Sequence, residues 1–455
     1  MNAPATRAER WRHLLTGSLN RRIFSAALVV GSLTFAARVA GMAKEMFVAS
    51  WFGTHDALDA FLAAFMLPSY AMIVLGNSID AALIPVFVEA REKEGPAAAQ
   101  RLLSGTLVFS VGGMLAATLL LAVAAPFLLP LLCPGFPPEK LLLTRQLFYL
   151  FLPGIVLAGL ITNCESALKA GEKFALASVV PCVVPLATVA ALALCGARWG
   201  IHSLAFGIVG GMLLQFAILA WSLHRRGLRL SPRWHGFDPG LRRVVRQYLP
   251  AVGASAIMCS TPLVDQSMAS LLPSGSVSAL SYANKFVALL LGIGTMALGT
   301  AVLPYFSKLA AQSDWKALRH TLRTYIGLIV LVTIPVVGAC IFLSKPLVAL
   351  LFQRGNFSPA DTENVAWIQA MYLLQVPCYT LTILFVRMIS SLQANHVLLW
   401  GTILSFTVNI TFDYVLMQYM GAAGIALSTS IVYTVLSCFL GFVLWRKLQA
   451  VSAGA

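Results

Sequence analysis

Long apolar stretches separated by short polar ones run along the whole chain. A membrane-spanning helix needs about 20 mainly apolar residues, and twelve segments of this sequence meet that requirement. They are centred near residues 36, 72, 115, 155, 185, 212, 258, 293, 332, 376, 408 and 434. Because lipid offers no hydrogen-bond partners, such stretches cross a bilayer as helices. The pattern predicts an all-α integral membrane protein with about twelve transmembrane helices.

The two halves of the chain resemble each other. Residues 83–87 (LIPVF) recur as residues 302–306 (VLPYF) at an offset of 219, and residues 126–128 (PFL) recur as residues 346–348 (PLV) at an offset of 220. Three further matches follow at offsets of 221 to 224. Each half has an even number of predicted helices, so the halves are parallel repeats with the same topology. We expect two six-helix lobes around a central cavity, a geometry suited to alternating access.

A polar stretch at residues 224–247 contains seven arginines and separates the two halves. It sets the domain boundaries that the sequence predicts. These are a cytoplasmic N-terminal tail at 1–22, an N-lobe at 23–226, an Arg-rich cytoplasmic linker at 227–240, a C-lobe at 241–447 and a cytoplasmic tail at 448–455.

The composition and the placement of charge support a membrane protein. The chain is 59% hydrophobic and 11% charged, and its formal net charge is +15. With the N-terminus in the cytoplasm, 23 Lys and Arg residues fall on the cytoplasmic side of the twelve segments and five on the opposite side. This asymmetry follows the positive-inside rule with both termini cytoplasmic. The basic net charge is therefore explained by the topology of the chain in the membrane, and we expect no nucleic-acid partner.

Charged side chains interrupt several apolar stretches. Arg38 and Lys44 lie in the first stretch, Asp59 and Asp80 in the second, and Lys285 in the second half. A charge at bilayer depth costs about 2.5–3.5 kcal/mol on insertion scales, so such residues usually face a wet cavity or each other. We expect Arg38, Lys44, Asp59 and Lys285 to line an interior site for an anionic cargo. The alternative for Lys44 is snorkelling to the interface or pairing with a nearby acid as a structural gate.

A second set of polar residues is rich in oxygen. Asn409 and Asp413 are four residues apart and share one helical face, while Asp265 and Thr429 lie in the predicted helices 7 and 12. Carboxylates, an amide and a hydroxyl are hard ligands that suit a small cation. Two carboxylates alone in a low-dielectric lobe would repel each other, and a shared small cation would remove that conflict. The alternative is that Asp413 is a helix-end charge near the outer surface.

Four blocks of sequence resemble one known family. They are ARVAGMAKEMFVASWFGTHDALDAFLAAFMLPSY (37–70), LVDQSMASLLPSGSVSALSYANKF (263–286), ALGTAVLPYFSKLA (298–311) and GAAGIALSTSIVY (421–433). The chain resembles the MviN/MurJ-type lipid II flippases of the multidrug/oligosaccharidyl-lipid/polysaccharide exporter superfamily. The resemblance implies a bacterial inner-membrane protein that moves an undecaprenyl-pyrophosphate-linked saccharide across the bilayer.

The resemblance also assigns roles to individual positions. Arg38 matches a cavity-lining arginine of the family, and Lys44 and Lys285 stand where the family has arginines. A family arginine pair is replaced by Met72 and Ile73. The sequence ends after the twelfth predicted helix, whereas typical members add two helices, so we expect a twelve-helix paralogue.

Some family members also have a sodium site with the pattern of the oxygen-rich set. Besides Asp265, Asn409, Asp413 and Thr429, that pattern includes a backbone carbonyl, which is that of Ile425 in this sequence. Sodium is therefore the one cofactor that we expect, as a coupling ion.

Other functions remain as alternatives. An exopolysaccharide repeat unit is an alternative cargo. A cation-coupled exporter of small molecules is favoured if the cavity is mainly acidic. A membrane-embedded glycan polymerase requires a large outer loop with catalytic acids, and the longest outer segments, near 133–145 and 353–366, are short. No Walker A, HExxH or GxSxG pattern is present. We therefore predict a monomeric transporter in contact with membrane lipids, and not an enzyme.

Overall fold

The computed structural model describes residues 18–171, 174–227, 230, 232–234, 236–312, 315–392, 394 and 396–453. Every regular element in these ranges is a helix. The helices are α2 (Ser18–Phe52), α3 (Asp56–Glu94), α4 (Pro96–Leu132), α5 (Pro138–Ala170), α6 (Phe174–Val179), the 3-10 helix η1 (Val180–Cys182), α7 (Val183–Trp199), α8 (His202–Arg225), α9 (Pro239–Met258), α10 (Thr261–Ala269), α11 (Ser276–Ala311), α12 (Trp315–Phe342), α13 (Ser344–Phe352), α14 (Pro359–Leu373), α15 (Gln375–Ser391), α16 (His396–Met420) and α17 (Ala422–Ala453).

The predicted all-α membrane fold is confirmed. Each of the twelve predicted segment centres falls within a helix. Within the described ranges, nine helices are long and apolar enough to cross a membrane. The count of twelve spans stays a prediction, as do the predicted lobe boundaries. The predicted N-terminal tail lies largely outside the described residues, and α17 continues through most of the predicted C-terminal tail.

Large apolar side chains on the helix surfaces are explained by a lipid environment. On α4, Leu120 is 70% exposed, Val123 75%, Phe127 79% and Leu131 72%. Their spacing of three to four residues puts them on one helical face. Exposure of such an apolar face to water costs free energy, whereas contact with lipid tails does not. The exposed face of α4 is therefore the expected surface of a membrane-spanning helix.

The chain forms two compact units. Unit 1 comprises the described residues of Met1–Lys44, Ala71–Leu121 and Leu150–Gly253, and unit 2 comprises those of Glu45–Tyr70, Ala122–Tyr149 and Ala254–Ala455. Each unit therefore contains segments from both predicted halves. In particular, parts of the first four long helices belong to unit 2 together with α10–α17.

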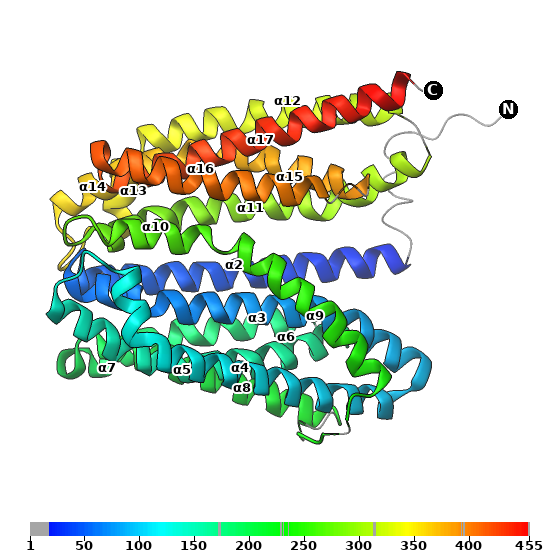
Figure 1. The fold of residues 1–455 in the computed structure, drawn as a ribbon, viewed down its shortest axis with the longest axis horizontal. Helices are drawn as coiled ribbons and strands as arrows, with labels where there is room; N and C mark the ends of the chain where they lie inside the picture. The colour runs from blue at the N-terminus through cyan, green and yellow to red at the C-terminus, as the bar shows by residue number, and fades with distance from the viewer. Residues whose placement is uncertain are drawn as a thin grey trace. The chain divides into compact units, whose positions relative to one another are not determined.

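Small residues allow close helix packing in unit 1. The helices α7 and α8 pack against each other along their length (Figure 1). A Cβ atom at Gly207 would come within 2.7 Å of the Thr188 Cα, and one at Gly211 within 2.9 Å of the Val184 Cα. Since no side chain fits at these two positions, glycine sets the short distance between the helices, as small-xxx-small motifs do in membranes.

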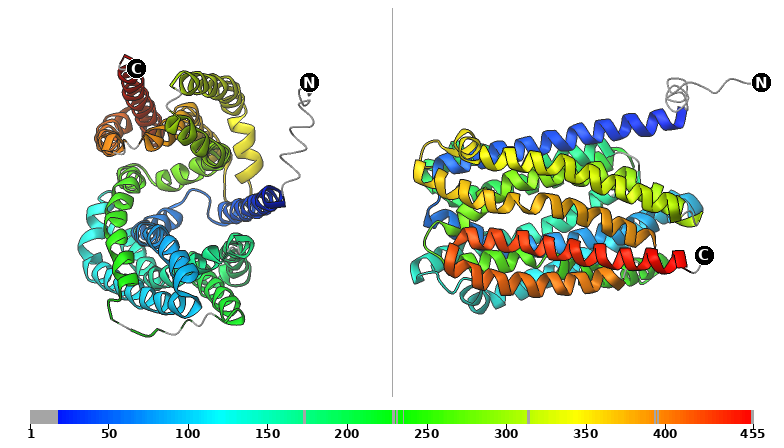
Figure 2. Two further views of the ribbon diagram at one scale, coloured as in Figure 1. Left: turned by 90° about the vertical axis from the view of Figure 1, so that its right-hand side faces the viewer. Right: turned by 90° about the horizontal axis from the view of Figure 1, so that it is seen from above.

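Unit 2 is built around a bundle of long helices. Figure 2 shows α16 and α17 as an antiparallel pair, and α17 also packs on α14 and α15. A core of fully buried side chains, among them Phe306, Leu318, Leu384 and Leu440, joins α11, α12, α15 and α17. The shorter α10 packs on α11, α16 and α17. This packing brings α10, α16 and α17, which contain the predicted cation ligands, next to one another.

Candidate functional site

The oxygen-rich cluster lies inside unit 2. Asn409 Nδ2 donates to Asp265 Oδ1 at 3.0 Å and to Asp413 Oδ2 at 3.1 Å. Thr429 Oγ1 is 3.5 Å from Asp265 Oδ2 and donates to the carbonyl of Ile425 at 3.2 Å. All five residues are buried. The structure thus brings together the whole predicted set, while its role as a cation site stays a prediction.

Two oxygens of this cluster lack partners. Asn409 Oδ1 and Asp413 Oδ1 are buried, and neither has a hydrogen-bond partner among the described residues. A buried polar atom without a partner is costly, and two neighbouring carboxylates in a low-dielectric interior repel each other. A small hard cation would relieve both problems, because its preferred ligands are carboxylate, amide and carbonyl oxygens. The residues present therefore fit sodium.

Lys285 is held by an acidic partner. Its Nζ is 3.0 Å from Glu45 Oε1 in unit 2, and the side chain of Lys285 is 39% exposed while that of Glu45 is 14% exposed. Glu45 directly follows Lys44 in α2. The pairing of Glu45 with Lys285, which lies 240 positions away, was not predicted from the sequence.

The other two predicted cargo cations lie in unit 1. Arg38 is exposed and forms no ion pair with any described residue, and Lys44 is partly exposed. Arg38 and Lys44 therefore belong to one unit and Lys285 to the other. The convergence of all three cations on one cargo stays a prediction.

Asp59 lies in a buried ion cluster. Its Oδ2 accepts from Lys140 Nζ at 2.9 Å and from the Gly275 backbone nitrogen at 2.8 Å, and its Oδ1 accepts from the Ser278 backbone nitrogen at 2.8 Å. Lys140 also pairs with Asp56 at 2.5 Å. We call these five residues the Lys140 cluster. Since Asp59 accepts from two backbone nitrogens at the start of α11, its negative charge stabilises that end of the helix. A contact between Asp59 and cargo stays a prediction.

Lys140 was missed in the sequence analysis, although one local signal was present. It lies in the first turn of α5, where the helix dipole disfavours a cation. Its side chain is only 6% exposed, and its Nζ lies 4.2 Å from the centre of the Phe136 ring. A buried lysine at a helix N-terminus requires acidic partners elsewhere in the fold. The acids that provide this compensation are Asp56 and Asp59.

Glycine turns bring backbones into direct contact beside the Lys140 cluster. Gly275 has φ +87° and faces the carbonyl of Thr54, and Gly355 has φ +57° and faces the carbonyl of Ser50. The Asn356 backbone nitrogen donates to the same Ser50 carbonyl at 2.9 Å. A side chain at either glycine would collide with a backbone carbonyl and occupy an unfavourable φ. These turns hold the end of α2 and the segment after it against the loops that precede α11 and α14.

A cavity of about 470 Å³ lies in unit 2 among the last residue of α9 and the helices α10, α11, α14, α15 and α17. We call it the C-half cavity. Asp265 and Thr429 of the oxygen-rich cluster line it, and so does Lys285. The two constellations that the sequence analysis treated separately thus share the wall of one cavity.

A separate charged network lies inside unit 1. Lys169 Nζ is 2.6 Å from Asp80 Oδ2 and 3.6 Å from Glu165 Oε2. Ser166 Oγ donates to Asp80, and Gln215 Nε2 donates to Glu165 Oε1 at 3.2 Å. Asp80, which the sequence analysis singled out for its depth in the second apolar stretch, is therefore paired within its own unit.

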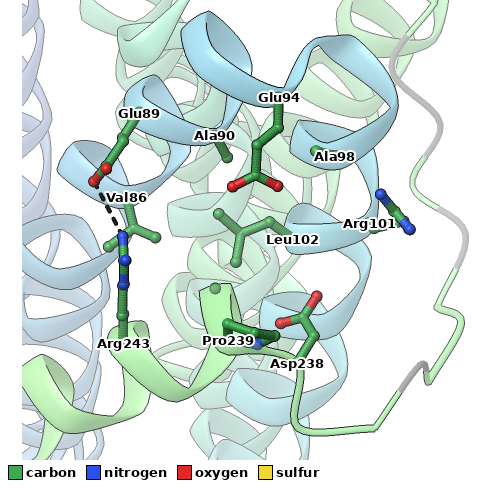
Figure 3. A pocket seen from close by; sticks show the side chains of 11 residues that line it. Val86, Glu89, Ala90, Glu94, Ala98, Arg101, Leu102, Asp238, Pro239 and Arg243 are labelled. Atoms are coloured by element: carbon green, nitrogen blue, oxygen red, sulfur yellow. Dashed lines mark hydrogen bonds and ion pairs between the residues drawn. The ribbon is translucent and has the colours of Figure 1, made fainter.

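A smaller pocket of about 230 Å³ lies where α3, α4 and α9 meet in unit 1 (Figure 3). Arg243 Nη1 is 3.4 Å from Glu89 Oε2, and Glu94 and Arg101 lie around the same pocket. Near the start of α9, the backbone nitrogen of Leu241 donates a hydrogen bond to Asp238 Oδ1 at 2.6 Å. These contacts fix the beginning of α9 on unit 1.

Comparison with known proteins identifies the family. The family model described as lipid II flippase MurJ matches residues 48–455. A probable lipid II flippase MurJ of Rhizobium meliloti is 26% identical over 407 residues, which are 87% of this chain and 76% of that protein. The Synechocystis protein with the same description is 26% identical over 453 residues, covering 96% of this chain and 84% of that protein.

Solved structures show the same fold. A structure of lipid II flippase MurJ in an inward closed conformation gives a TM-score of 0.77 at 21% identity and covers 94% of this chain and 90% of that chain. An inward-facing multidrug resistance MATE family transporter gives 0.76 at 14% identity, with 94% of this chain and 99% of that chain covered. Because the family model matches most of the sequence, the chain belongs to the lipid II flippase MurJ family.

Proposed function

We propose that this chain is an alternating-access flippase of the bacterial inner membrane. Its cargo would be an undecaprenyl-pyrophosphate-linked saccharide, either lipid II or a related cell-envelope glycan precursor. The relatives named lipid II flippase and the membrane-length helices support this proposal. The single observation that carries it is Lys285, a cation in the wall of the C-half cavity. Both termini would lie in the cytoplasm, in keeping with the positive-inside rule.

Lys285 and Glu45 suggest how an anionic cargo is received. Before cargo binds, the 3.0 Å ion pair keeps both charges satisfied. A pyrophosphate has more negative charge than one carboxylate, so it competes for the lysine and releases Glu45. Lysine binds phosphate as a point charge, whereas arginine grips it as a fork. We therefore expect weaker but less geometrically strict binding than an arginine would provide.

The Lys140 cluster would keep one end of the transport path closed. It joins the starts of α3, α5 and α11, three helix ends that the positive-inside topology assigns to the outer side. Alternating access requires that such contacts form and break between states. Asp59 would then serve transport as a gate residue.

Sodium is the coupling ion that we propose. Asp265, Asn409, Asp413 and Thr429 would hold it together with the Ile425 carbonyl. When bound, the ion supplies a positive charge that offsets the two carboxylates. The orphaned Asn409 Oδ1 and Asp413 Oδ1 support this assignment.

The proposal is tested by binding of a pyrophosphate-linked saccharide lipid to the purified protein in nanodiscs. Loss of one charge-assisted hydrogen bond costs about 1.5–3 kcal/mol, so Lys285→Gln should weaken binding about tenfold or more. Lys285→Arg should retain binding because it keeps the charge. The matched control is Lys345→Gln, since Lys345 is exposed and pairs with Glu363 away from the cavity. Equal affinity of Lys285→Gln and the native protein would refute the proposal.

The likeness to MATE transporters favours one alternative, a cation-coupled exporter of small molecules. The two alternatives differ in the charge of the cargo. In proteoliposomes, export of a cationic dye without movement of the saccharide lipid would favour the exporter. Movement of lipids with different saccharides at equal rates would point to a broader glycan range, such as exopolysaccharide repeat units.

A further inference from the structure

The C-half cavity has the size of a ligand site. Its volume of about 470 Å³ falls within the 300–1,000 Å³ usual for small-molecule pockets. All of its lining residues belong to unit 2. Typical ligand pockets are lined mainly by apolar side chains, whereas eleven of the seventeen residues around this cavity have a hydroxyl, an amide or a charge. The cavity is therefore built for a polar ligand.

Beyond the pyrophosphate proposed for Lys285 and the cation proposed for Asp265, the charges around the cavity do not favour a further ionic ligand. Asp265 and Lys285 are its two charged lining residues, and both have partners. Asp265 is bonded to Asn409 and Thr429, and Lys285 pairs with Glu45. A cationic drug would find no uncommitted carboxylate here, and one lysine is too little to hold a second phosphate. The other polar groups that line the cavity are neutral hydroxyls and amides.

Three amide side chains line this neutral environment. Gln375 is 3% exposed and lines the cavity, and its side chain forms no hydrogen bond with any described residue. Gln266 Oε1 is also buried without a partner in the described part of the chain. Asn284 is exposed on the same wall. An amide has both donors and an acceptor, so a ligand with many hydroxyl groups could hydrogen-bond to Gln375 and Asn284.

Tyrosines complete the wall. Tyr379 and Tyr433 meet edge to face with ring centroids 4.9 Å apart, and Tyr372 lies near them on α14. A tyrosine offers an apolar face together with a polar tip. A sugar ring has the matching surface, because its C–H groups form apolar patches and its hydroxyls project around them.

We propose that the C-half cavity is a binding subsite for a neutral sugar ring of the cargo. The inference rests on the proposed flippase function and assigns a saccharide contact to unit 2. Gln375 and Asn284 would hydrogen-bond to sugar hydroxyls, and Tyr379 and Tyr433 would pack against the ring. Lys285, on the same wall, would contact the neighbouring pyrophosphate. The subsite also borders Asp265, so the sugar and the proposed cation would bind on opposite sides of one carboxylate.

The test uses two probes that differ only in the sugar. These are farnesyl pyrophosphate and farnesyl-pyrophosphoryl-N-acetylglucosamine, and their binding to the full-length protein in nanodiscs is measured by calorimetry. Gln375→Ala and Asn284→Ala should each weaken the sugar-bearing probe about fivefold to tenfold, the loss expected for one neutral hydrogen bond. Both variants should leave the affinity for farnesyl pyrophosphate within twofold of the native value.

Controls separate this subsite from simpler explanations. Gln418→Ala removes an exposed amide on α16 outside the cavity and should change neither affinity. Asn284 is exposed, so its replacement leaves no packing defect. The Asn284 variant therefore still tests the proposal if the Gln375 variant fails to fold. Equal weakening of both probes, or no weakening, would overturn the sugar subsite while leaving the flippase proposal intact. Failure of the native protein to bind either probe would overturn both.

Discussion

Replacement of Lys140 by methionine should destabilise the protein strongly. The lysine side chain is 6% exposed and that of Asp59 is 2% exposed, with their charged atoms 2.9 Å apart. Removal of one partner of a buried ion pair costs about 3–5 kcal/mol, because the other charge stays buried. Asp59 keeps the two backbone donors of Gly275 and Ser278. We therefore expect a cost near the lower limit, about 3 kcal/mol.

Thermal unfolding of the purified protein in detergent measures this effect, and a double-mutant cycle isolates it. Lys140→Met should lower the melting temperature by several degrees. Adding Asp59→Asn to that variant removes the orphaned charge, so the double variant should lose less stability than the two single losses combined. Lys345→Met is the control, because the ion pair of Lys345 with Glu363 is exposed and contributes at most about 1 kcal/mol to stability. Strict additivity, or a Lys140 variant that melts like the native protein, would refute the reasoning.

Three further outcomes are expected. Sodium should raise the melting temperature of the native protein, by linkage to the folded state, and Asp413→Ala should abolish that rise as followed by calorimetry. Gly355→Ala should destabilise by more than about 1 kcal/mol, because φ is +57° and the Ser50 carbonyl blocks a side chain; denaturation that matches the native protein would contradict this. Arg243→Gln should change stability by less than about 1 kcal/mol, since its pair with Glu89 is exposed; a larger loss on thermal unfolding would assign the pair a structural role.

The sequence predicted features that depend on local pattern. Runs of apolar residues indicated the helices, since lipid leaves few alternatives to helix formation. Asn409 and Asp413 were placed on one face by helical spacing alone. The approach of Asp265 and Thr429 to that face came from the family resemblance, because spacing along the chain cannot bring α10 and α17 together.

The sequence did not predict tertiary partners. Lys140 is 81 positions from Asp59 and falls in the predicted outer segment near 133–145, whereas the structure puts it in the first turn of α5. The pairing of Glu45 with Lys285 was missed for the same reason. The short α13 and the interruption between α9 and α10 also gave no clear signal. In each case the partner or the helix end depends on packing between segments that are distant in the sequence. The periodicity of apolar residues carries no information about such packing.

Transbilayer movement of the cargo tests the central claim most directly. The native protein and the Lys285→Gln and Lys285→Arg variants are reconstituted into proteoliposomes with a fluorescent undecaprenyl-pyrophosphate-linked saccharide, and its exposure in the outer leaflet is followed by quenching. The account predicts movement with the native protein, at least tenfold slower movement with Lys285→Gln, and retained movement with Lys285→Arg. Native protein that moves the lipid no faster than empty liposomes, or a Lys285→Gln variant that moves it at the native rate, would contradict the account.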